Sequence, residues 1–440
     1  MLSASLELGN DKKTVGPLIP GYCLVPFLLV TGLFFLWAIP NNLNDVLIRQ
    51  FMKSFELSRV QAGLVQSAFY LGYFFVSIPA AVLMRRRGYK FGLITGLMLY
   101  SAGSFLFLPA ALLRSYQLFL AALFVIASGL GFLETGANPL IAQMGDPETA
   151  VRRLNFAQAF NPLGSIFGVL VGTSFIFSGI ELSPVEVAQR KLMGSYDAYL
   201  RAETMRVIVP YLAVAVLVLL WMFMIARTRF PALAEEYSQV DVTPRGGYRQ
   251  LLCYPHFLLA VFTQFCYTGA QVGTWSYFIQ YVQDYTHQPE RFAGNMLTIT
   301  LIAFGVGRFL SSLLMKRISP GRLMAIFAVA NILLLTFAIL RPGWAGMIAI
   351  LATSFFMSLM FPTIFALGLG GLGKNTKSGA SILVMAIIGG AVFTPLMGLI
   401  SQSTHSMAKA MILPLLCYGI VVIYGIWGSK LKPRLTLFSK

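Results

Sequence analysis

Long apolar stretches recur along the whole chain of 440 residues. A bilayer-spanning helix needs about 20 mostly apolar residues, and about twelve stretches of that kind are each ended by charge, proline or glycine. They cover residues 22–48, 62–84, 91–112, 117–143, 154–179, 206–228, 256–284, 292–315, 322–340, 343–369, 379–402 and 408–428. Charged residues make up 11% of the chain, against roughly 25% in soluble domains. The sequence therefore predicts an all-α membrane protein and excludes a secreted scaffold, a disordered chain and an ordinary cytosolic enzyme.

The basic residues are divided unevenly between the two sides that twelve spans create. The formal net charge is +17. With a cytoplasmic N-terminus, 21 Lys and Arg residues fall in cytoplasmic segments and 11 in external ones, and Arg308 falls within a span. Cytoplasmic loops of membrane proteins carry such an excess, so we expect both termini in the cytoplasm and the chain in a bacterial inner membrane. The same bias accounts for the basic character without a nucleic-acid partner.

The two halves of the chain repeat each other. The basic run at 83–88 closes the second span, and the run at 314–317 closes the eighth, at the same place in its half. Asn138-Pro139 in the fourth span likewise corresponds to Phe361-Pro362 in the tenth. Repeats of six helices in the same orientation are typical of major facilitator transporters. We predict two six-helix bundles with pseudo-two-fold symmetry, in five parts: a cytoplasmic segment 1–21, an N-terminal bundle 22–229, a cytoplasmic linker 230–255, a C-terminal bundle 256–429 and a tail 430–440.

Two carboxyls lie within predicted spans, Asp45 late in the first and Glu134 near the middle of the fourth. A charge at bilayer depth costs about 2.5–3.5 kcal/mol, so each must face a polar cavity or carry a proton. Desolvation favours the protonated form, and water that enters an opened cavity favours the anion. Alternating exposure can therefore load a proton on one side and release it on the other. We predict that both couple protons, with a solvated rim position as the alternative for Asp45.

Amide side chains recur beside these carboxyls. They comprise Asn41 and Asn42 before Asp45, Asn138 one turn after Glu134, and Asn155, Gln158 and Asn161 at intervals of three on the fifth span. Amides offer donors and acceptors together, which suits a neutral ligand rich in hydroxyl groups. The alternative is that they bond helices to one another. We predict that Asn42, Asn138, Gln158 and Asn161 line a polar cavity wall.

The C-terminal half carries aromatic rings beside amides. Gln264, Tyr267, Gln271 and Trp275 are spaced by three and four on the seventh span, and Phe361 lies on the tenth. Sugars stack their C–H faces on rings while their hydroxyls take hydrogen bonds. We predict Gln271, Trp275 and Phe361 as sugar-binding residues, with packing or an interfacial aromatic belt as the alternative.

These residues fall in runs that resemble the L-fucose:proton symporters of the fucose–galactose–glucose permease group. The matching runs are residues 35–38, 41–45, 61–70, 133–139, 154–161, 264–271, 275–277 and 362–365, and the resemblance covers nearly the whole chain. It implies that Asp45 and Glu134 match the two essential acidic residues of the group. It also implies that Asn42, Gln158 and Asn161 lie on the polar wall. Phe361 departs from the pattern, which has tyrosine there, and so does Pro162, where serine is usual; a proline there can bend the fifth helix.

The function predicted from the sequence is proton-coupled import of L-fucose by alternating access, with the proton as coupling ion and no other cofactor. A glucose or galactose symporter of the same group is the first alternative, and a multidrug exporter the second. We expect no enzyme, because no nucleophile–base pair is visible, and no metal site, because the four cysteines are scattered and the three histidines lie at span ends. The expected partners are a monosaccharide, protons and lipid, and the expected transport unit is a monomer.

Overall fold

The computed structural model describes residues 19–145, 150–230, 248–315, 317–372 and 375–431. Most of the predicted N-terminal segment, most of the linker, most of the tail and the side chain of Asn155 lie outside this part. The helices of the first half are α1 (Leu24–Ser54), α2 (Arg59–Phe105), α3 (Phe107–Leu112), α4 (Tyr116–Gln143), α5 (Ala150–Gln158), α6 (Phe160–Val171), α7 (Pro184–Leu192), α8 (Tyr196–Met205) and α9 (Ile208–Arg227). Those of the second half are α11 (Tyr248–Leu251), α12 (Pro255–Ser276), α13 (Phe278–Thr286), α14 (Glu290–Leu314), α15 (Pro320–Leu340), α16 (Trp344–Met357), α17 (Met360–Leu369), α18 (Thr376–Met385), α19 (Gly389–Thr404), α20 (Met407–Ala410) and α21 (Ile412–Ile426).

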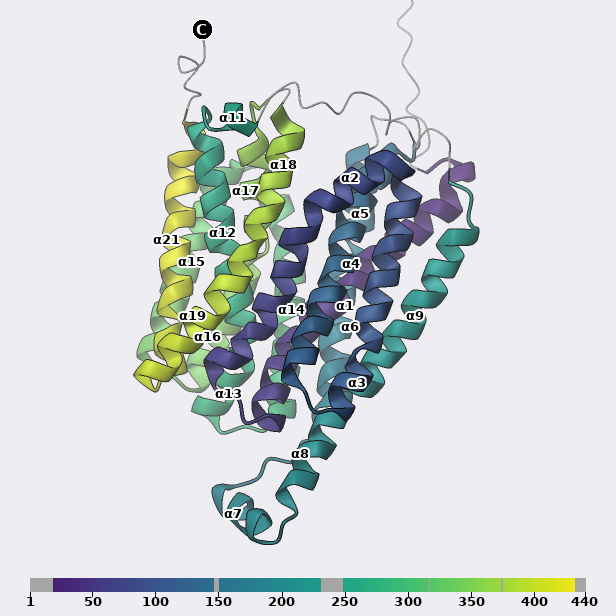
Figure 1. Ribbon diagram of the computed structural model, residues 1–440. Coiled ribbons are helices and arrows are strands. Elements are labelled where there is room, and N and C mark those ends of the chain that lie inside the picture. Colours follow the sequence, from purple (N-terminus) through teal and green to yellow (C-terminus); the bar gives the residue numbers. More distant parts are fainter. Residues whose placement is uncertain (1–18, 146–149, 231–247, 316, 373–374, 432–440) are drawn as a thin grey trace, which may run out of the picture.

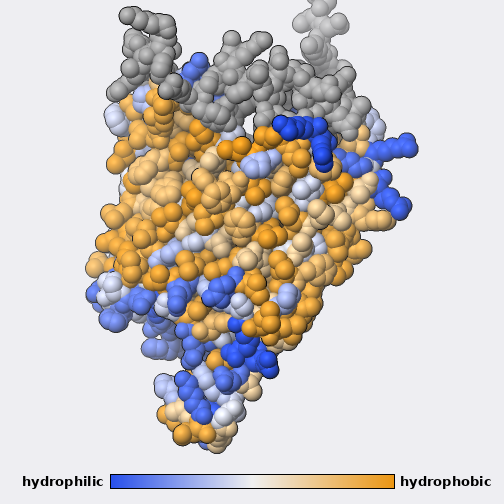
Figure 2. Space-filling view, in the orientation of Figure 1, coloured by the Kyte–Doolittle hydropathy of each residue, from blue (hydrophilic) through white to orange (hydrophobic). Residues whose placement is uncertain are grey.

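The long helices form two bundles that stand side by side with their axes roughly parallel (Figure 1). Eleven helical segments of the described chain are long and apolar enough to cross a membrane. The predicted seventh span is the twelfth segment; it is more polar, and it is divided into α12 and α13 at Tyr277. Figure 2 shows a broad apolar surface around the bundles, with polar side chains gathered mainly toward the two ends. Such a surface suits a hydrocarbon environment.

Two ends of the molecule serve as reference points. We call them the α11 end and the α7 end, after the short helices that mark them at the top and bottom of Figure 1. Spans 2 and 3 run on into each other at the α11 end through Gly88, whose φ of 82° and ψ of 163° interrupt α2. That backbone conformation is essentially restricted to glycine. The chain therefore reverses there without a long loop.

Two spans are interrupted three or four residues before a proline. The fifth divides into α5 and α6 at Ala159, and Pro162 follows; the tenth divides into α16 and α17 at Ser358 and Leu359, and Pro362 follows. Proline has no N–H and its ring clashes with the carbonyl four residues earlier. The predicted bend of the fifth helix is thus present, and the tenth helix shares it.

Close helix contacts are made at small residues. A Cβ at Gly96 would lie 2.8 Å from the carbonyl oxygen of Gly129, so α2 and α4 approach almost backbone to backbone there. Gly168 approaches the carbonyl oxygen of Ile39 in the same way, which holds α6 against α1. Contacts of this kind replace the hydrophobic driving force that is missing between helices in lipid.

The predicted span boundaries need two corrections at the α7 end. The first span extends to Ser54, so that Arg49 and Lys53 belong to α1 and not to a loop. The sixth span begins earlier than predicted, because α8 precedes α9 and contains Glu203. Glu203 and Glu290, which the sequence placed in loops or at span edges, are 3% and 0% exposed. The buried carboxyls therefore number more than the two that hydropathy indicates.

Candidate functional site: a polar strip and a sealed carboxyl

Glu134 lies in a polar strip that joins α4 to α5. Asn138 donates from Nδ2 to the backbone oxygen of Glu134 at 3.1 Å, and Gln158 donates from Nε2 to Asn138 Oδ1 at 3.3 Å. Glu134 and Asn138 are half-buried, and Gln158 is exposed. Within the described residues the Glu134 carboxylate makes no ion pair. The structure thus joins three of the predicted residues in one strip, in which the bond to Glu134 is made to its backbone oxygen and not to its carboxyl.

Asp45 lies at a junction between the two halves. Its Oδ1 accepts hydrogen bonds from Gln66 Nε2 at 3.0 Å and from Ser276 Oγ at 2.9 Å, and Gln66 also donates to Ser276 at 2.9 Å. Asp45 is only 4% exposed, so the rim position considered from the sequence is wrong. Asp45 is therefore sealed between the halves, whereas Glu134 is half-buried.

The other two amides of the predicted wall contact neighbouring helices. Asn42 Nδ2 donates to the backbone oxygen of Ala38 at 2.9 Å and to Ser165 Oγ at 2.8 Å, and its side chain is 7% exposed. Asn161 Nδ2 donates weakly, at 3.4 Å, to the backbone oxygen of Phe34. Among the described residues, no hydrogen bond to the side-chain oxygen of Asn42 or of Asn161 is formed. Part of the amide wall thus also bonds α1 to α6, which was the alternative weighed for these residues.

Trp275 and Phe361 form ring contacts in the second half. Trp275 Nε1 donates to Ser354 Oγ at 2.9 Å, and its ring packs edge-on against Phe304 at 5.1 Å. Phe361 stacks with Phe365 at 6.3 Å. Trp275 and Phe361 are both half-buried, as is Gln271. Gln271, Trp275 and Phe361 are therefore each partly open to contact, and their role in sugar binding stays a prediction.

Arg308, the basic residue predicted within a span, lies 5.1 Å from the ring of Phe304. Its guanidinium carbon sits over the ring face, which is a favourable position for a cation. Phe304 also contacts Trp275, so Arg308 and Trp275 share one aromatic neighbour. It forms no ion pair within the described residues.

The hydrogen bonds and ion pairs between the halves gather toward the α7 end. Arg59 reaches Asp284 Oδ2 at 2.5 Å and Ser401 Oγ at 2.5 Å, and Tyr277 Oη donates to the backbone oxygen of Arg59 at 2.6 Å. Lys53 Nζ reaches Glu290 Oε1 at 2.7 Å. These contacts close the α7 end of the molecule in this state, with Asp45 behind them. Their pairing could not be found from the sequence, because the partners are more than 200 positions apart.

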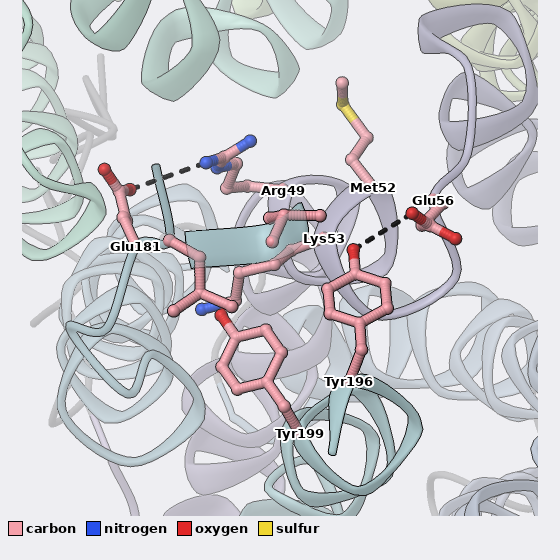
Figure 3. A pocket seen from close by; sticks show the side chains of 9 residues that line it. Arg49, Met52, Lys53, Glu56, Glu181, Tyr196 and Tyr199 are labelled. Atoms are coloured by element: carbon pink, nitrogen blue, oxygen red, sulfur yellow. Dashed lines mark hydrogen bonds and ion pairs between the residues drawn. The ribbon is translucent and has the colours of Figure 1, made fainter. Parts of the chain in front are cut away.

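A cavity of about 240 Å³ opens beside this closure, lined by Arg49, Met52, Lys53, Glu56, Glu181, Leu182, Val187, Tyr196 and Tyr199. Figure 3 shows Arg49 paired with Glu181 and Tyr196 hydrogen-bonded to Glu56 across it. All nine residues belong to the first half, and none was predicted to bind sugar or protons. The cavity gives water a path to the charged side chains at the α7 end.

The Major Facilitator Superfamily profile matches residues 27–393. The chain belongs to this superfamily. Its relatives in the superfamily include the L-fucose-proton symporter of Escherichia coli, which is 41% identical over 92% of this chain and 94% of its own length. The glucose/galactose transporter of Brucella abortus is 35% identical over 91% of this chain and 93% of its own length. The predicted fold and family are therefore confirmed, and the multi-pass membrane character with them.

The crystal structure of FucP, a Major Facilitator Superfamily transporter, in the outward conformation has a TM-score of 0.70 at 40% identity, over 93% of this chain and all of the other. Another superfamily member, the D-xylose-proton symporter, has a TM-score of 0.68 at 13% identity, which shows the shared fold alone. Because the present structure is closed at the α7 end, it gives a view of the contacts that form when a carrier of this superfamily seals that side.

Proposed function

We propose that this protein imports L-fucose together with protons across a bacterial inner membrane. The observation that carries the proposal is the strip formed by half-buried Glu134 and Asn138 and exposed Gln158, in a chain 41% identical to an L-fucose-proton symporter. Within the described residues the Glu134 carboxyl makes no ion pair. A carboxyl in such a place can exchange a proton with water in the cavity, and amides can bind sugar hydroxyls. No cofactor other than the proton is required, and one chain supplies all the named residues.

In the proposed cycle the α7 end faces the outside and the α11 end faces the cytoplasm. The excess of basic residues on the segments at the α11 end supports this orientation. Sugar and proton enter while the α7 end is open. They bind between the predicted polar wall of the first half and the predicted sugar-binding residues of the second half, which are Gln271, Trp275 and Phe361. Closure of the α7 end then buries Asp45 behind its contact with Ser276 and leaves Glu134 accessible from the other side. The described structure corresponds to this second stage.

Transport by purified protein in liposomes tests the proposal. With an inward proton gradient, labelled L-fucose should accumulate, and a Glu134→Gln variant should lose accumulation but still exchange labelled for unlabelled sugar. Glu56→Gln is the matched control, because Glu56 is exposed and touches no predicted site residue. Accumulation by Glu134→Gln at the wild-type level would reject the coupling role.

A glucose or galactose symporter is the second candidate, favoured by the Brucella relative and by the phenylalanine at position 361. Competition separates the two candidates: unlabelled D-galactose and D-glucose should leave L-fucose uptake unchanged if the main proposal holds. Orientation is tested separately with Leu192→Cys, since Leu192 is 90% exposed at the end of α7. An impermeant maleimide should label this variant in cells whose inner membrane is intact and whose outer membrane is permeable.

A further inference from the structure

Three charged side chains meet in the closure at the α7 end. Lys53 Nζ lies 2.9 Å from Glu203 Oε2 and 2.7 Å from Glu290 Oε1. Their side chains are 9%, 3% and 0% exposed respectively. One ammonium therefore serves two buried carboxylates. A buried carboxylate needs a cation or hydrogen bonds beside it. Here Glu203 and Glu290 both pair with Lys53.

The two carboxylates belong to different halves of the molecule. Lys53 ends α1 and Glu203 lies in α8, both in the first half, whereas Glu290 begins α14 in the second. Gln50 Nε2 also donates to Glu203 Oε2, at 3.1 Å. When the halves separate at this end, the contact between Lys53 and Glu203 can persist, and the contact between Lys53 and Glu290 must break. Opening thus frees Glu290 to water while Lys53 keeps a partner.

The neighbouring groups add further contacts across the closure. Glu181 accepts from Arg49 at 3.4 Å, from the backbone N–H of Glu290 at 3.0 Å and from Gln283. Tyr199 lines the adjoining cavity together with Glu56.

Two arginines, Arg206 and Arg291, bind the backbone oxygen of Phe177, and Arg206 also binds that of Ile176. Gly179 N–H donates to Glu290 Oε1 at 3.3 Å. These guanidinium groups are committed to carbonyl oxygens, so Lys53 remains the cation in direct contact with both buried carboxylates.

We propose that Glu203 and Glu290 compete for Lys53, and that this competition sets the balance between the closed and open states of the α7 end. The three residues act as positioning residues of the transport cycle and touch neither the predicted sugar wall nor Glu134. The side of the membrane to which this end opens rests on the proposed function; the competition itself does not.

If the two carboxylates compete, removing Lys53 and removing Glu203 should shift the balance between open and closed states in opposite directions. Lys53→Met leaves two adjacent carboxylates buried without a cation in the closed state, so it should favour opening. Glu203→Gln removes the competitor, and closure then forms a neutral pair of Lys53 with Glu290, so it should favour the closed state. Adding Glu290→Gln to Lys53→Met removes one of the two stranded carboxylates and ends the repulsion between them, so it should reverse most of the opening.

The test measures how often the α7 end opens. Gln280 is 2% exposed and contacts Met52 of the other half at 3.4 Å, so a Gln280→Cys thiol becomes reactive only when the closure opens. The variants are compared in a background whose four native cysteines are replaced by serine, in nanodiscs without sugar or gradient. Modification by a small thiosulfonate proceeds at a rate proportional to the open fraction when opening is fast.

The expected rate rises about tenfold or more for Lys53→Met, falls about threefold or more for Glu203→Gln, and returns to within about threefold of the reference for Lys53→Met with Glu290→Gln. Lys191→Met is the matched control, because Lys191 pairs with Glu56 in an exposed position at the same end, and its rate should not change. An increase for Glu203→Gln, or no reversal in the double variant, would overturn the proposal. Glu203→Gln removes one carboxylate and leaves Lys53 paired, so it stays informative if Lys53→Met does not fold. Because no sugar is present, failure of symport would leave these rates unchanged.

Discussion

Closure of the α7 end depends on a glycine in α19 that leaves room for the other half. A Cβ at Gly398 would lie 2.6 Å from Tyr277 Oη and 2.7 Å from the backbone oxygen of Arg59. These two atoms are themselves joined by the hydrogen bond that crosses the closure. Gly398→Ala must therefore push Arg59 and its helix away from α19, and this clash with the first half exists only while the α7 end is closed.

The size of the effect follows from these distances. One extra methyl group in a well-packed contact costs about 1–3 kcal/mol, and about 1.4 kcal/mol corresponds to a tenfold change in an equilibrium constant. Gly398→Ala should thus raise the ratio of open to closed molecules by about 5-fold to 150-fold. The gain in helix propensity from glycine to alanine, about 1 kcal/mol, is the same in both states and cancels.

The thiol at position 280 reports this shift directly. Its modification should accelerate in Gly398→Ala by the factor above, and net L-fucose uptake should fall because the carrier closes less often. Gly419→Ala provides the control, since no atom lies within 4 Å of a Cβ at Gly419 in α21. Equal modification rates in Gly398→Ala and the parent, or equal acceleration by both alanine variants, would refute the packing argument.

Three further predictions concern the fold and the two walls. Gly88→Ala should lower the melting temperature of the purified protein, because its φ of 82° suits only glycine; a melting temperature equal to that of the parent would contradict this. Trp275→Phe removes the hydrogen bond to Ser354 and should raise the KM for L-fucose several-fold with little change in thermal stability, whereas an unaltered KM would remove Trp275 from the sugar site. Asp45→Asn preserves the shape of the sealed side chain but removes its exchangeable proton, so gradient-driven accumulation should be lost, and normal accumulation would exclude Asp45 from coupling.

The sequence identified the accessible part of the site better than the closed part. Glu134, Asn138 and Gln158 could be grouped from helical spacing and from the resemblance, and the structure joins them in one strip. Asp45 was recognised as functional, but its partners Gln66 and Ser276 were not. Neither partner is unusual in its own helix, so no local signal marks them.

The sequence analysis placed three charged residues at helix ends in loops or at span edges, and there is a physical reason for this. Lys53, Glu203 and Glu290 lie where hydropathy indicates loops, and loop charges are normally solvated. Glu203 and Glu290 are nevertheless buried, and Lys53 lies between them where the two halves meet. Burial of this kind depends on the relative position of two bundles, which hydropathy along one chain does not contain.

Spacing and composition determined what each helix is: its length, the small residues where it approaches a neighbour, the prolines that follow the breaks in the fifth and tenth spans, and the polar face that holds Glu134. These properties depend on residues within a few turns of one another. Only the tertiary structure decided that the α7 end is closed, that Asp45 is sealed, and that Lys53 pairs with both Glu203 and Glu290. Those outcomes depend on contacts between residues that lie more than 100 positions apart, and such contacts form only when whole bundles have packed.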